Sequence, residues 1–457
     1  MTSTAAVELF DRWRRSGQEV AVVGLGKSGV SATLLLRTMG IPVYASDTGS
    51  GPTYEDWART LRNAGAQAQI GGHDLQRIAR SAGVVVAPGV PPDVPALTAA
   101  RGAGIDIYAE VDIGFLALGR TRCIGITGTN GKTTTTALIA HVLTTAGLRA
   151  ETAGNIGRPL CDIARSEHPP DWLALELSSF QLHDAPHLTP SIGVLTNLAP
   201  NHLDRYATLE EYYGDKAQLF RNASRDSFWV TNGDDRAVQE MSRAVPGSQV
   251  RFSIERRSHG WYDREGGRLM LGNQALLQRD SLPLLGDHNV ANALAAALVA
   301  AQIGAPLPKI AEGLRSFRAI PHRVEPIREV DGVLWINDSK STNITSTEVA
   351  VAAQQRPFVL LLGGRHKGEP YTRLAEPLRE RCRAVVAYGE AKPLIQRDLG
   401  SSLKVVPADS FDEVLTTARG LTRPGDAVLL SPACSSYDMF RNYEERGDRF
   451  RAAVEAL

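Results

Sequence analysis

Two glycine-rich segments have the residue types that bind phosphate groups. In the first, residues 20–29, Gly24, Gly26 and Gly29 have the G-x-G-x-x-G spacing at which a buried strand turns into a helix beside a pyrophosphate. Asp47 ends the next apolar segment, at the place where an NAD enzyme keeps the acid that binds ribose. Taken alone, these residues predict a dinucleotide site and a dehydrogenase.

The second segment, CIGITGTNGKTTTT, is a phosphate loop that a simple dehydrogenase does not need. It follows a buried strand and precedes a helical pattern, so Lys132 can reach the β- and γ-phosphates of ATP and Thr133 can bind Mg²⁺. The strict P-loop pattern has a glycine where this chain has Ile126, so a chance glycine turn is the alternative. The residues expected to bind ATP here are Gly128, Thr129, Asn130, Gly131, Lys132, Thr133 and Thr134.

Two further polar side chains are expected at the same edge of the sheet. Glu176 lies in an apolar strand, and because burying an unpaired carboxylate is costly, a nearby cation such as Mg²⁺ explains it. The loop after the next strand brings His202 to this edge, since the carboxyl ends of parallel strands meet there. The alternatives are a strand-end glutamate that reaches solvent and an ordinary surface histidine.

The composition favours small-molecule partners. Lys and Arg together number 50, as do Asp and Glu, and this balance argues against a broad surface for nucleic acid or anionic lipid. The 4 cysteines have no C-x-x-C spacing, which suits a reducing compartment. The N-terminal segment has no apolar signal core, and the longest apolar stretch is too short to span a bilayer. We therefore expect a cytoplasmic protein that binds neither membrane nor nucleic acid. We also expect it to be a monomer.

Short apolar strands alternate with glycine turns and helical patterns along the whole chain, which predicts an α/β fold with parallel sheets. A length of 457 residues suggests about three domains. We expect a Rossmann-like domain over 1–112, a central P-loop ATPase-type domain with a parallel sheet over 113–319, and a Rossmann-like C-terminal domain over 320–457.

The segment ATLEEYYGDKAQLF predicts a helix with one unusual residue. Thr208 and Glu211 form a capping-box pattern at its start. Lys216 falls on the apolar stripe of this helix, where the period calls for a buried residue. From the pattern alone, a lysine that lays its stem along the apolar surface and lifts its ammonium into water is the simpler interpretation.

Nine motifs occur along the chain in the order TGTNGKTT, AGNIG, ELSSFQL, TNLAPNHLDRY, GDHNVANALAA, PHRVE, NDSKSTN, LLGGRHKG and LLSPACSSYDMFRNYEERG. In combination and in this order, they resemble the Mur ligases, which use ATP to add amino acids to UDP-N-acetylmuramic acid in peptidoglycan synthesis. Among family members, the chain most resembles those that add D-glutamate to UDP-N-acetylmuramoyl-L-alanine.

The resemblance implies that the first glycine loop holds the diphosphate of a UDP-sugar, because a helix N-terminus binds pyrophosphate whatever nucleoside it carries. Gly49 stands where relatives can carry a uridine-contacting arginine, and Ala87 replaces a common serine. Asn155 can equally be a turn residue. The residues implied to bind this substrate are Gly26, Lys27, Ser28, Asp47, Thr48, Gly89, Asn155 and His202.

The resemblance also implies sites for adenosine and for D-glutamate. Arg323 and Lys340, which the first of these sites includes, would otherwise pass as surface charges, and relatives can have phenylalanine in place of Tyr443 in the second. The implied adenosine ligands are Asn289, Asn292, Arg323, Asp338 and Lys340, and the implied D-glutamate ligands are Thr342, Lys367, Ser436 and Tyr443.

The implied chemistry is activation of a carboxylate as an acyl phosphate, followed by attack of the D-glutamate amine. The catalytic residues would be Lys132, Glu176, His202 and Lys216, with two Mg²⁺ ions held by Thr133, Glu176, His202 and Lys216. In relatives the lysine matching Lys216 reacts with CO₂ to form a carbamate, which provides an anionic oxygen ligand.

Three other interpretations remain open at this stage. A nicotinamide dehydrogenase would explain the first glycine loop but not the second. An amino acid ligase such as folylpolyglutamate synthase shares the central and last domains but lacks the nucleotide-sugar domain. An ATP-binding scaffold without catalytic activity would keep the motif residues unused.

Overall fold

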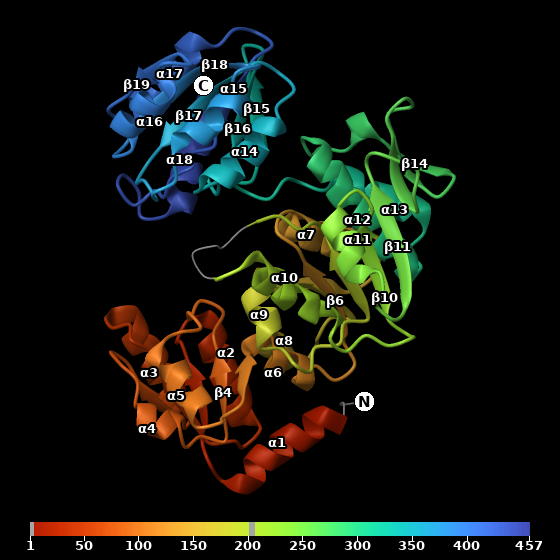
Figure 1. Cartoon of the computed structure of the whole chain (residues 1–457), viewed down its shortest axis with the longest axis vertical. Helices are drawn as coiled ribbons and strands as arrows, with labels where there is room; N and C mark the ends of the chain where they lie inside the picture. The colour runs from red at the N-terminus through yellow and green to blue at the C-terminus, as the bar shows by residue number, and fades with distance from the viewer. Residues whose placement is uncertain (1–3, 201–205) are drawn as a thin grey trace. The chain divides into compact units, whose positions relative to one another are not determined.

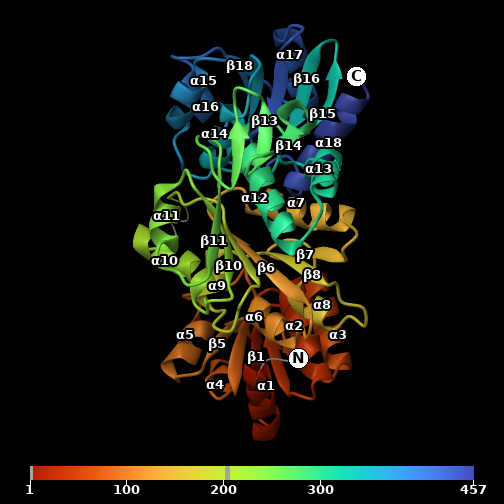
Figure 2. The same ribbon diagram turned by 90° about the vertical axis from the view of Figure 1, so that its right-hand side faces the viewer.

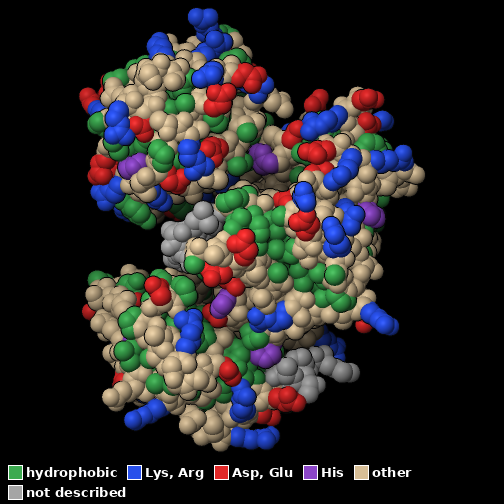
Figure 3. All heavy atoms as spheres, in the orientation of Figure 1, with side chains coloured by type: hydrophobic (Ala, Val, Ile, Leu, Met, Phe, Trp, Pro, Cys, Tyr) green, Lys and Arg blue, Asp and Glu red, His purple; other side chains and the backbone are tan. Residues whose placement is uncertain are grey.

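A computed structural model of the chain describes residues 4–200 and 206–457 (Figure 1). Its strands form three separate sheets, of 5, 9 and 6 strands, which confirms the predicted α/β class. Within the described residues, no helix combines the length and the apolar character needed to cross a membrane. On the face drawn in Figure 3, basic and acidic side chains are interspersed, as the balanced charge predicts.

The first sheet is entirely parallel, with strand order β3-β2-β1-β4-β5. Its central strands are continuous apolar runs because helices cover both faces. Helices α1, α2 and α3 pack on one face, and α4 and α5 pack on the other. The elements are α1 (Thr4–Ser16), β1 (Val20–Val23), α2 (Lys27–Thr38), β2 (Val43–Ser46), α3 (Pro52–Asn63), β3 (Gln67–Gln69), α4 (Leu75–Ile78), β4 (Gly83–Val86), α5 (Pro95–Gly102) and β5 (Ile107–Ala109).

Helix α6 (Glu110–Ala117) follows the first sheet directly and carries two buried carboxylates. Asp112 accepts hydrogen bonds from the backbone N–H of His187 at 2.9 Å and pairs with its Nδ1 at 2.7 Å. Glu110 accepts the backbone N–H of Cys161 at 2.7 Å, and burial raises the pKa of this carboxyl to about 7. These contacts tie α6 to segments of the central domain.

The central sheet has the order β14-β13-β12-β11-β10-β9-β6-β8-β7. Strands β6 to β11 pair in parallel, as predicted. Strand β13 pairs in antiparallel orientation with both β12 and β14, which departs from the predicted parallel sheet; β13 and β14 are labelled in Figure 2. The short turns at residues 264–267 and 272–273 leave no room for crossover helices, so these strands must reverse direction.

The elements of the central domain are β6 (Arg122–Thr127), α7 (Lys132–Thr145), β7 (Ala150–Gly154), α8 (Leu160–Ala164), β8 (Trp172–Glu176), α9 (Ser179–His183), β9 (Ile192–Leu195), α10 (Leu209–Ala217), η1 (Gln218–Phe220), β10 (Phe228–Asn232), α11 (Arg236–Ser242), β11 (Ser248–Ser253), β12 (Gly260–Asp263), β13 (Arg268–Leu271), β14 (Gln274–Gln278), η2 (Arg279–Ser281), α12 (Asp287–Ile303) and α13 (Leu307–Ser316).

The last sheet has the order β15-β16-β20-β17-β18-β19 and is parallel except for the pairing of β15 with β16. Apolar residues of β17 and β20 fill the core on both faces. Its elements are β15 (Glu325–Val330), β16 (Val333–Asn337), α14 (Ile344–Ala352), β17 (Phe358–Gly363), η3 (Tyr371–Leu374), α15 (Ala375–Leu378), β18 (Cys382–Tyr388), α16 (Lys392–Leu399), β19 (Val405–Pro407), α17 (Phe411–Leu421), β20 (Ala427–Leu430) and α18 (Tyr443–Glu455).

The chain divides into two compact units. The first contains Met1–Arg279 and Ala291–Arg315, and the second contains Asp280–Val290 and Ser316–Leu457. The first two sheets therefore belong to one unit, and the last sheet belongs to the other. The proposed boundaries at 112/113 and 319/320 stay predictions.

Candidate active site

The first glycine loop borders a cavity of about 440 Å³ at the carboxyl ends of β1, β2 and β4. Helix α2 begins directly after the N-cap residue Gly26, so its N-terminus faces this space. The cavity brings together six of the residues predicted to bind the UDP-substrate: Gly26, Lys27, Ser28, Asp47, Thr48 and Gly89.

Asp47 shapes this loop through both carboxylate oxygens. One oxygen accepts the backbone N–H of Leu25 at 2.6 Å, and the other accepts that of Gly49 at 2.6 Å. A carboxylate has further acceptor capacity, but its position is already fixed by these two bonds. Asp47 therefore holds the phosphate loop in shape at the edge of the cavity.

Two glycines are explained by close packing. A side chain at Gly29 would overlap the carbonyl oxygen of Gly24, which accounts for the third glycine of the motif. A side chain at Gly49 would overlap the ring of Tyr54. The structure thus gives a physical reason why this chain has no arginine at position 49.

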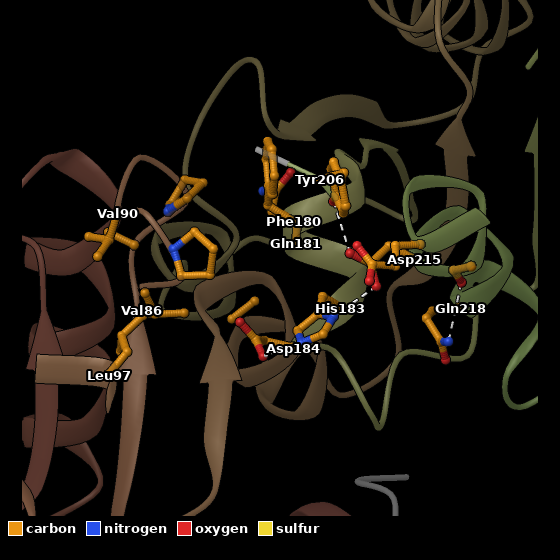
Figure 4. A pocket seen from close by; sticks show the side chains of 16 residues that line it. Val86, Val90, Leu97, Phe180, Gln181, His183, Asp184, Tyr206, Asp215 and Gln218 are labelled. Carbon is orange, nitrogen blue, oxygen red and sulfur yellow. Dashed lines mark hydrogen bonds and ion pairs between the residues drawn. The ribbon is translucent and has the colours of Figure 1, made fainter. Parts of the chain in front are cut away.

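A second cavity, of about 520 Å³, shares Ala87, Pro88 and Val90 with the first (Figure 4). Its other side is polar: His183 Nδ1 lies 2.8 Å from Asp215 Oδ1, and Tyr206 donates its hydroxyl to Asp215 Oδ2 at 2.9 Å. The first contact connects α9 to α10, and the second connects the segment before α10 to that helix. The two cavities form adjoining spaces between the first glycine loop and the central domain.

The second phosphate loop links β6 to α7 with two glycines at positive φ, Gly128 at 145° and Gly131 at 78°. L-residues with side chains rarely adopt these angles, so the glycines permit the turn. Lys132 folds back over the loop, where its Nζ donates to the carbonyl of Gly128 at 2.9 Å and to that of Thr129 at 2.8 Å. Thr133 and Thr134 follow in the first turn of α7.

Lys216 reaches the same loop from α10. The helix begins after Thr208, whose side chain accepts the N–H of Glu211, as predicted. Lys216 is 1% exposed, its Nζ donates to the Gly128 carbonyl at 2.7 Å, and it lies 4.6 Å from the ring centroid of Tyr212. The ammonium therefore points into the site instead of into water. Burial, and then the charge of Lys132, lower the pKa of Lys216 to about 6.

Residues at the end of β9, which the sequence analysis did not assign to the site, brace the phosphate loop. Thr196 Oγ1 donates to the Asn130 carbonyl at 2.7 Å, and Asn197 Oδ1 accepts the Asn130 N–H at 2.9 Å. Thr129 Oγ1 donates to the carbonyl of Ala199 at 3.0 Å. Thr196 and Asn197 lie in the TNLAPNHLDRY motif, which is the one sequence feature that could have indicated their place in the site.

Glu176 ends β8 and is 2% exposed. Its Oε1 accepts a hydrogen bond from Asn155 Nδ2 at 2.8 Å, whereas its buried Oε2 has no hydrogen-bond partner within residues 4–200 and 206–457. A buried carboxylate oxygen without a hydrogen-bond partner is costly, and a bound cation at this position would compensate for that cost.

Mg²⁺ takes oxygen ligands in proteins, often only one or two carboxylates together with phosphate oxygens. Two of the described residues predicted to bind it, Glu176 and Thr133, have side-chain oxygens of this kind. No cluster of three or more His, Cys, Asp or Glu side chains is placed to hold a metal within the described ranges. His202, the other predicted ligand, lies outside the described residues.

Of the two asparagines predicted to bind adenosine, Asn292 packs against the phosphate loop. Its Oδ1 accepts a hydrogen bond from Thr135 Oγ1 at 3.1 Å, and a side chain on Gly131 would overlap it. Asn289 belongs to the second unit, where its Nδ2 donates to the Leu285 carbonyl at 2.8 Å.

In the second unit, the turn after β16 carries Asp338, which is 4% exposed. Its carboxylate accepts hydrogen bonds from Val324 N–H at 3.1 Å and from Ser431 Oγ at 2.8 Å. Burial raises the pKa of Asp338 to about 6 in spite of these bonds and the charge of Arg323. Asp338 and Arg323 are thus close enough to interact electrostatically.

Of the four residues predicted to bind D-glutamate, two contact each other, one contacts Lys340 and one has a buried side chain. Lys367 Nζ donates to Thr342 Oγ1 at 3.3 Å. Tyr443, the first residue of α18, accepts a hydrogen bond from Lys340 Nζ at 2.7 Å. Ser436 is 2% exposed, in the loop after β20.

Three family domains match the chain in order. Residues 18–109 match the Mur ligase MurD-like N-terminal domain, residues 126–300 match the Mur ligase middle domain, and residues 322–434 match the Mur ligase glutamate ligase domain. These ranges correspond to the three sheets of the structure.

Curated relatives extend over nearly the whole chain. The UDP-N-acetylmuramoylalanine–D-glutamate ligase of Salinibacter ruber is 38% identical over 465 residues, covering 98% of this chain and 99% of the relative. The ligase of the same name from Gloeobacter violaceus is 39% identical, covering 96% and 99%. That from Myxococcus xanthus is 38% identical, covering 97% and 99%.

Solved structures support the same fold. The UDP-N-acetylmuramate-alanine ligase MurC of Thermotoga maritima has a TM-score of 0.60 at 20% identity and covers 96% of this chain and 99% of that structure. A pseudomurein peptide ligase type C of Methanothermus fervidus has a TM-score of 0.59 at 20% identity and covers 96% and 100%. With three matching domains and relatives this similar over their full length, the chain belongs to the Mur ligase family.

Proposed function

We propose that this protein is an ATP-dependent ligase that joins D-glutamate to UDP-N-acetylmuramoyl-L-alanine. The observation that carries the proposal is the full-length identity of 36–39% to curated D-glutamate ligases, which includes the substrate-binding first domain and the last domain. The reaction belongs to peptidoglycan precursor synthesis, on which cell shape and cell division depend. We propose that the enzyme works as a cytoplasmic monomer.

The UDP-substrate would bind in the cavity beside the first glycine loop. Backbone N–H groups at the start of α2 are suited to a diphosphate, and Lys27 adds a positive charge. Asn155 would contact the muramoyl end of the substrate, near the carboxylate of Glu176. The adjoining cavity gives the sugar room toward the central domain.

ATP would first activate the L-alanyl carboxylate. A carboxylate oxygen attacks the γ-phosphorus, the bond from that phosphorus to the β–γ bridging oxygen breaks, and ADP leaves. Lys132, held over the loop by the carbonyls of Gly128 and Thr129, is placed to stabilise the charge that develops on the transferred phosphoryl group. When bound, Mg²⁺ supplies further charge neutralisation, and Thr133 and Glu176 are the described residues that would hold it.

D-glutamate would then displace phosphate from the acyl phosphate. Its ammonium loses a proton, the amine nitrogen bonds to the carbonyl carbon, and phosphate leaves with an oxygen that belonged to the substrate carboxylate. Lys367 with Thr342, and the hydroxyl of Ser436, offer a cation and hydrogen-bond donors that suit a dicarboxylate.

Lys216 would act as its carbamate. A neutral amine is needed for reaction with CO₂, and the pKa of Lys216 lowered to about 6 makes that form dominant at neutral pH. The product, an anionic oxygen ligand beside Lys132, would join the residues that hold Mg²⁺. His202 would bind Mg²⁺ together with the Lys216 carbamate and would also contact the UDP-substrate.

The other interpretations are less well supported. A dehydrogenase leaves the second phosphate loop and the buried Lys216 without a role. A folylpolyglutamate synthase would not match a MurD-like N-terminal domain. A scaffold without activity does not account for a buried, unpaired carboxylate oxygen on Glu176 within the described residues.

The test is an amino acid panel. The purified protein is mixed with ATP, Mg²⁺ and UDP-N-acetylmuramoyl-L-alanine, and phosphate release is followed with each amino acid in turn. We expect release that depends on D-glutamate. Equal release with L-glutamate, or no release with any amino acid, would show that the proposal is wrong.

A further inference from the structure

Lys340 and Tyr443 are held together by a short side-chain contact in the second unit. Lys340 Nζ donates to the Tyr443 hydroxyl at 2.7 Å, and the same nitrogen lies 4.4 Å from the centroid of the ring. A hydrogen bond to a cation is stronger than one between neutral groups, and the aromatic face adds a cation–π attraction.

The backbones that carry the two side chains are fixed independently of this contact. Ser339 Oγ donates to the Tyr443 carbonyl at 2.8 Å. The fully buried Arg446 donates to Ser339 Oγ at 2.9 Å and to the Ser339 carbonyl at 2.8 Å. The turn after β16 and the start of α18 would therefore keep their places without the Tyr443 hydroxyl.

The lysine side chain is different, because a four-carbon stem has many rotamers of similar energy. The structure provides the Tyr443 hydroxyl as an acceptor that selects one of them. Burial and the nearby Glu444 raise the pKa of Tyr443, so the hydroxyl stays protonated while its oxygen accepts from the ammonium.

We propose that Tyr443 is a positioning residue that holds the Lys340 ammonium in place to contact ATP. The inference rests on the proposed function and on the sites that the family resemblance implies, in which Lys340 contacts ATP and Tyr443 borders the D-glutamate site. It assigns the hydroxyl, which phenylalanine lacks, to the ATP site and not to recognition of the amino acid.

The test is Tyr443→Phe, which removes the hydroxyl and keeps the ring. We expect kcat to fall about tenfold, the size of a lost hydrogen bond to a charged group, while KM for D-glutamate changes less than about twofold. Tyr262→Phe is the matched control. The ring centroid of Tyr262 also lies beside a cation, 5.1 Å from Arg264 Cζ, but Tyr262 belongs to β12 and not to a predicted ligand site. It should leave kcat unchanged.

A double-mutant cycle with Lys340→Met tests whether the Tyr443 hydroxyl affects kcat through the Lys340 ammonium. If Tyr443 acts through Lys340, adding Tyr443→Phe to Lys340→Met should cause no further loss. Losses that multiply, a raised KM for D-glutamate at unchanged kcat, or full activity in Tyr443→Phe would each overturn the inference. Thermal unfolding of each variant checks that it is folded. Absence of D-glutamate-dependent turnover in the unmodified protein would instead overturn the proposed function.

Discussion

At the scale of single residues, the site depends on two lysines that share one carbonyl oxygen. Lys132 and Lys216 both donate to Gly128, at 2.9 and 2.7 Å, although they come from different helices. Two ammonium groups this close repel each other, and burial disfavours the charge on Lys216 further. The repulsion disappears if Lys216 is neutral, and the interaction with Lys132 becomes attractive if Lys216 carries an anionic carbamate.

This electrostatic arrangement makes the modification of Lys216 depend on pH. The neutral amine reacts with CO₂ to give a carbamate and a proton, so at fixed CO₂ pressure the modified fraction should rise as pH increases through about 6. Carbon-13 NMR of protein equilibrated with labelled CO₂ would detect a carbamate signal that grows over this range.

Lys216→Ala should lack that signal and lose more than about 100-fold in turnover, with partial recovery in a short added carboxylate or bicarbonate. Lys309→Ala is the control, because Lys309 is 49% exposed on α13 and pairs with Glu312. An unchanged carbamate signal in Lys216→Ala, or full activity of that variant, would contradict the assignment.

Glu176 and Lys132 should affect catalysis without affecting the UDP-substrate. Glu176→Gln keeps an oxygen that can accept from Asn155 but removes the negative charge, and Lys132→Ala removes the cation of the phosphate loop. Each should lower turnover more than about 100-fold. Calorimetry should find the affinity for UDP-N-acetylmuramoyl-L-alanine unchanged; an affinity loss as large as the rate loss would mean that the two sites are not separate.

At the scale of elements, the end of β9 supports the phosphate loop. Thr196→Val keeps the side-chain shape and removes the hydrogen bond from Oγ1 to the Asn130 carbonyl, a loss of about 1 kcal/mol. We expect kcat/KM for ATP to fall about fivefold. Thr145→Val on α7 is the matched control, since its hydroxyl also bonds to a backbone carbonyl, that of His141. Equal effects of the two substitutions would argue against a specific role for β9.

Helix α6 ties the first sheet to the central domain through Asp112. His187→Ala would leave that fully buried carboxylate without its ring partner, so we expect unfolding to become easier by about 1–3 kcal/mol. Denaturant titration measures this, with the exposed His168→Ala as control. A stability equal to that of the control would mean that the contact contributes little.

At the scale of the whole molecule, strong local patterns predicted much of the fold. Apolar runs such as VAVV and FVLLLG form strands buried on both faces, which is typical of a parallel sheet covered by helices. Lys216 falls on an apolar stripe, and from that pattern alone an ammonium in water was the simpler interpretation; the structure instead buries the residue, at 1% exposure. The antiparallel β12–β14 extension was missed because its strands are short and partly polar.

Contacts between distant segments could not be predicted from local pattern. The meeting of Lys216 with Gly128 joins residues 88 positions apart, and the brace from Thr196 to Asn130 spans 66. Asp47 was predicted as a ligand-facing acid, but which atoms its oxygens bind depends on how the glycine loop closes over β2. Side-chain roles of this kind follow from tertiary packing.

The central claim is that the protein activates a carboxylate as an acyl phosphate and transfers the acyl group to D-glutamate. Its most direct test uses UDP-N-acetylmuramoyl-L-alanine labelled with oxygen-18 in the alanyl carboxylate, together with ATP, Mg²⁺ and either D- or L-glutamate. Mass spectrometry follows the amide product and the released phosphate. The account predicts that product forms with D-glutamate and that the phosphate carries label from the carboxylate. Product without labelled phosphate, or equal product from L-glutamate, would contradict it.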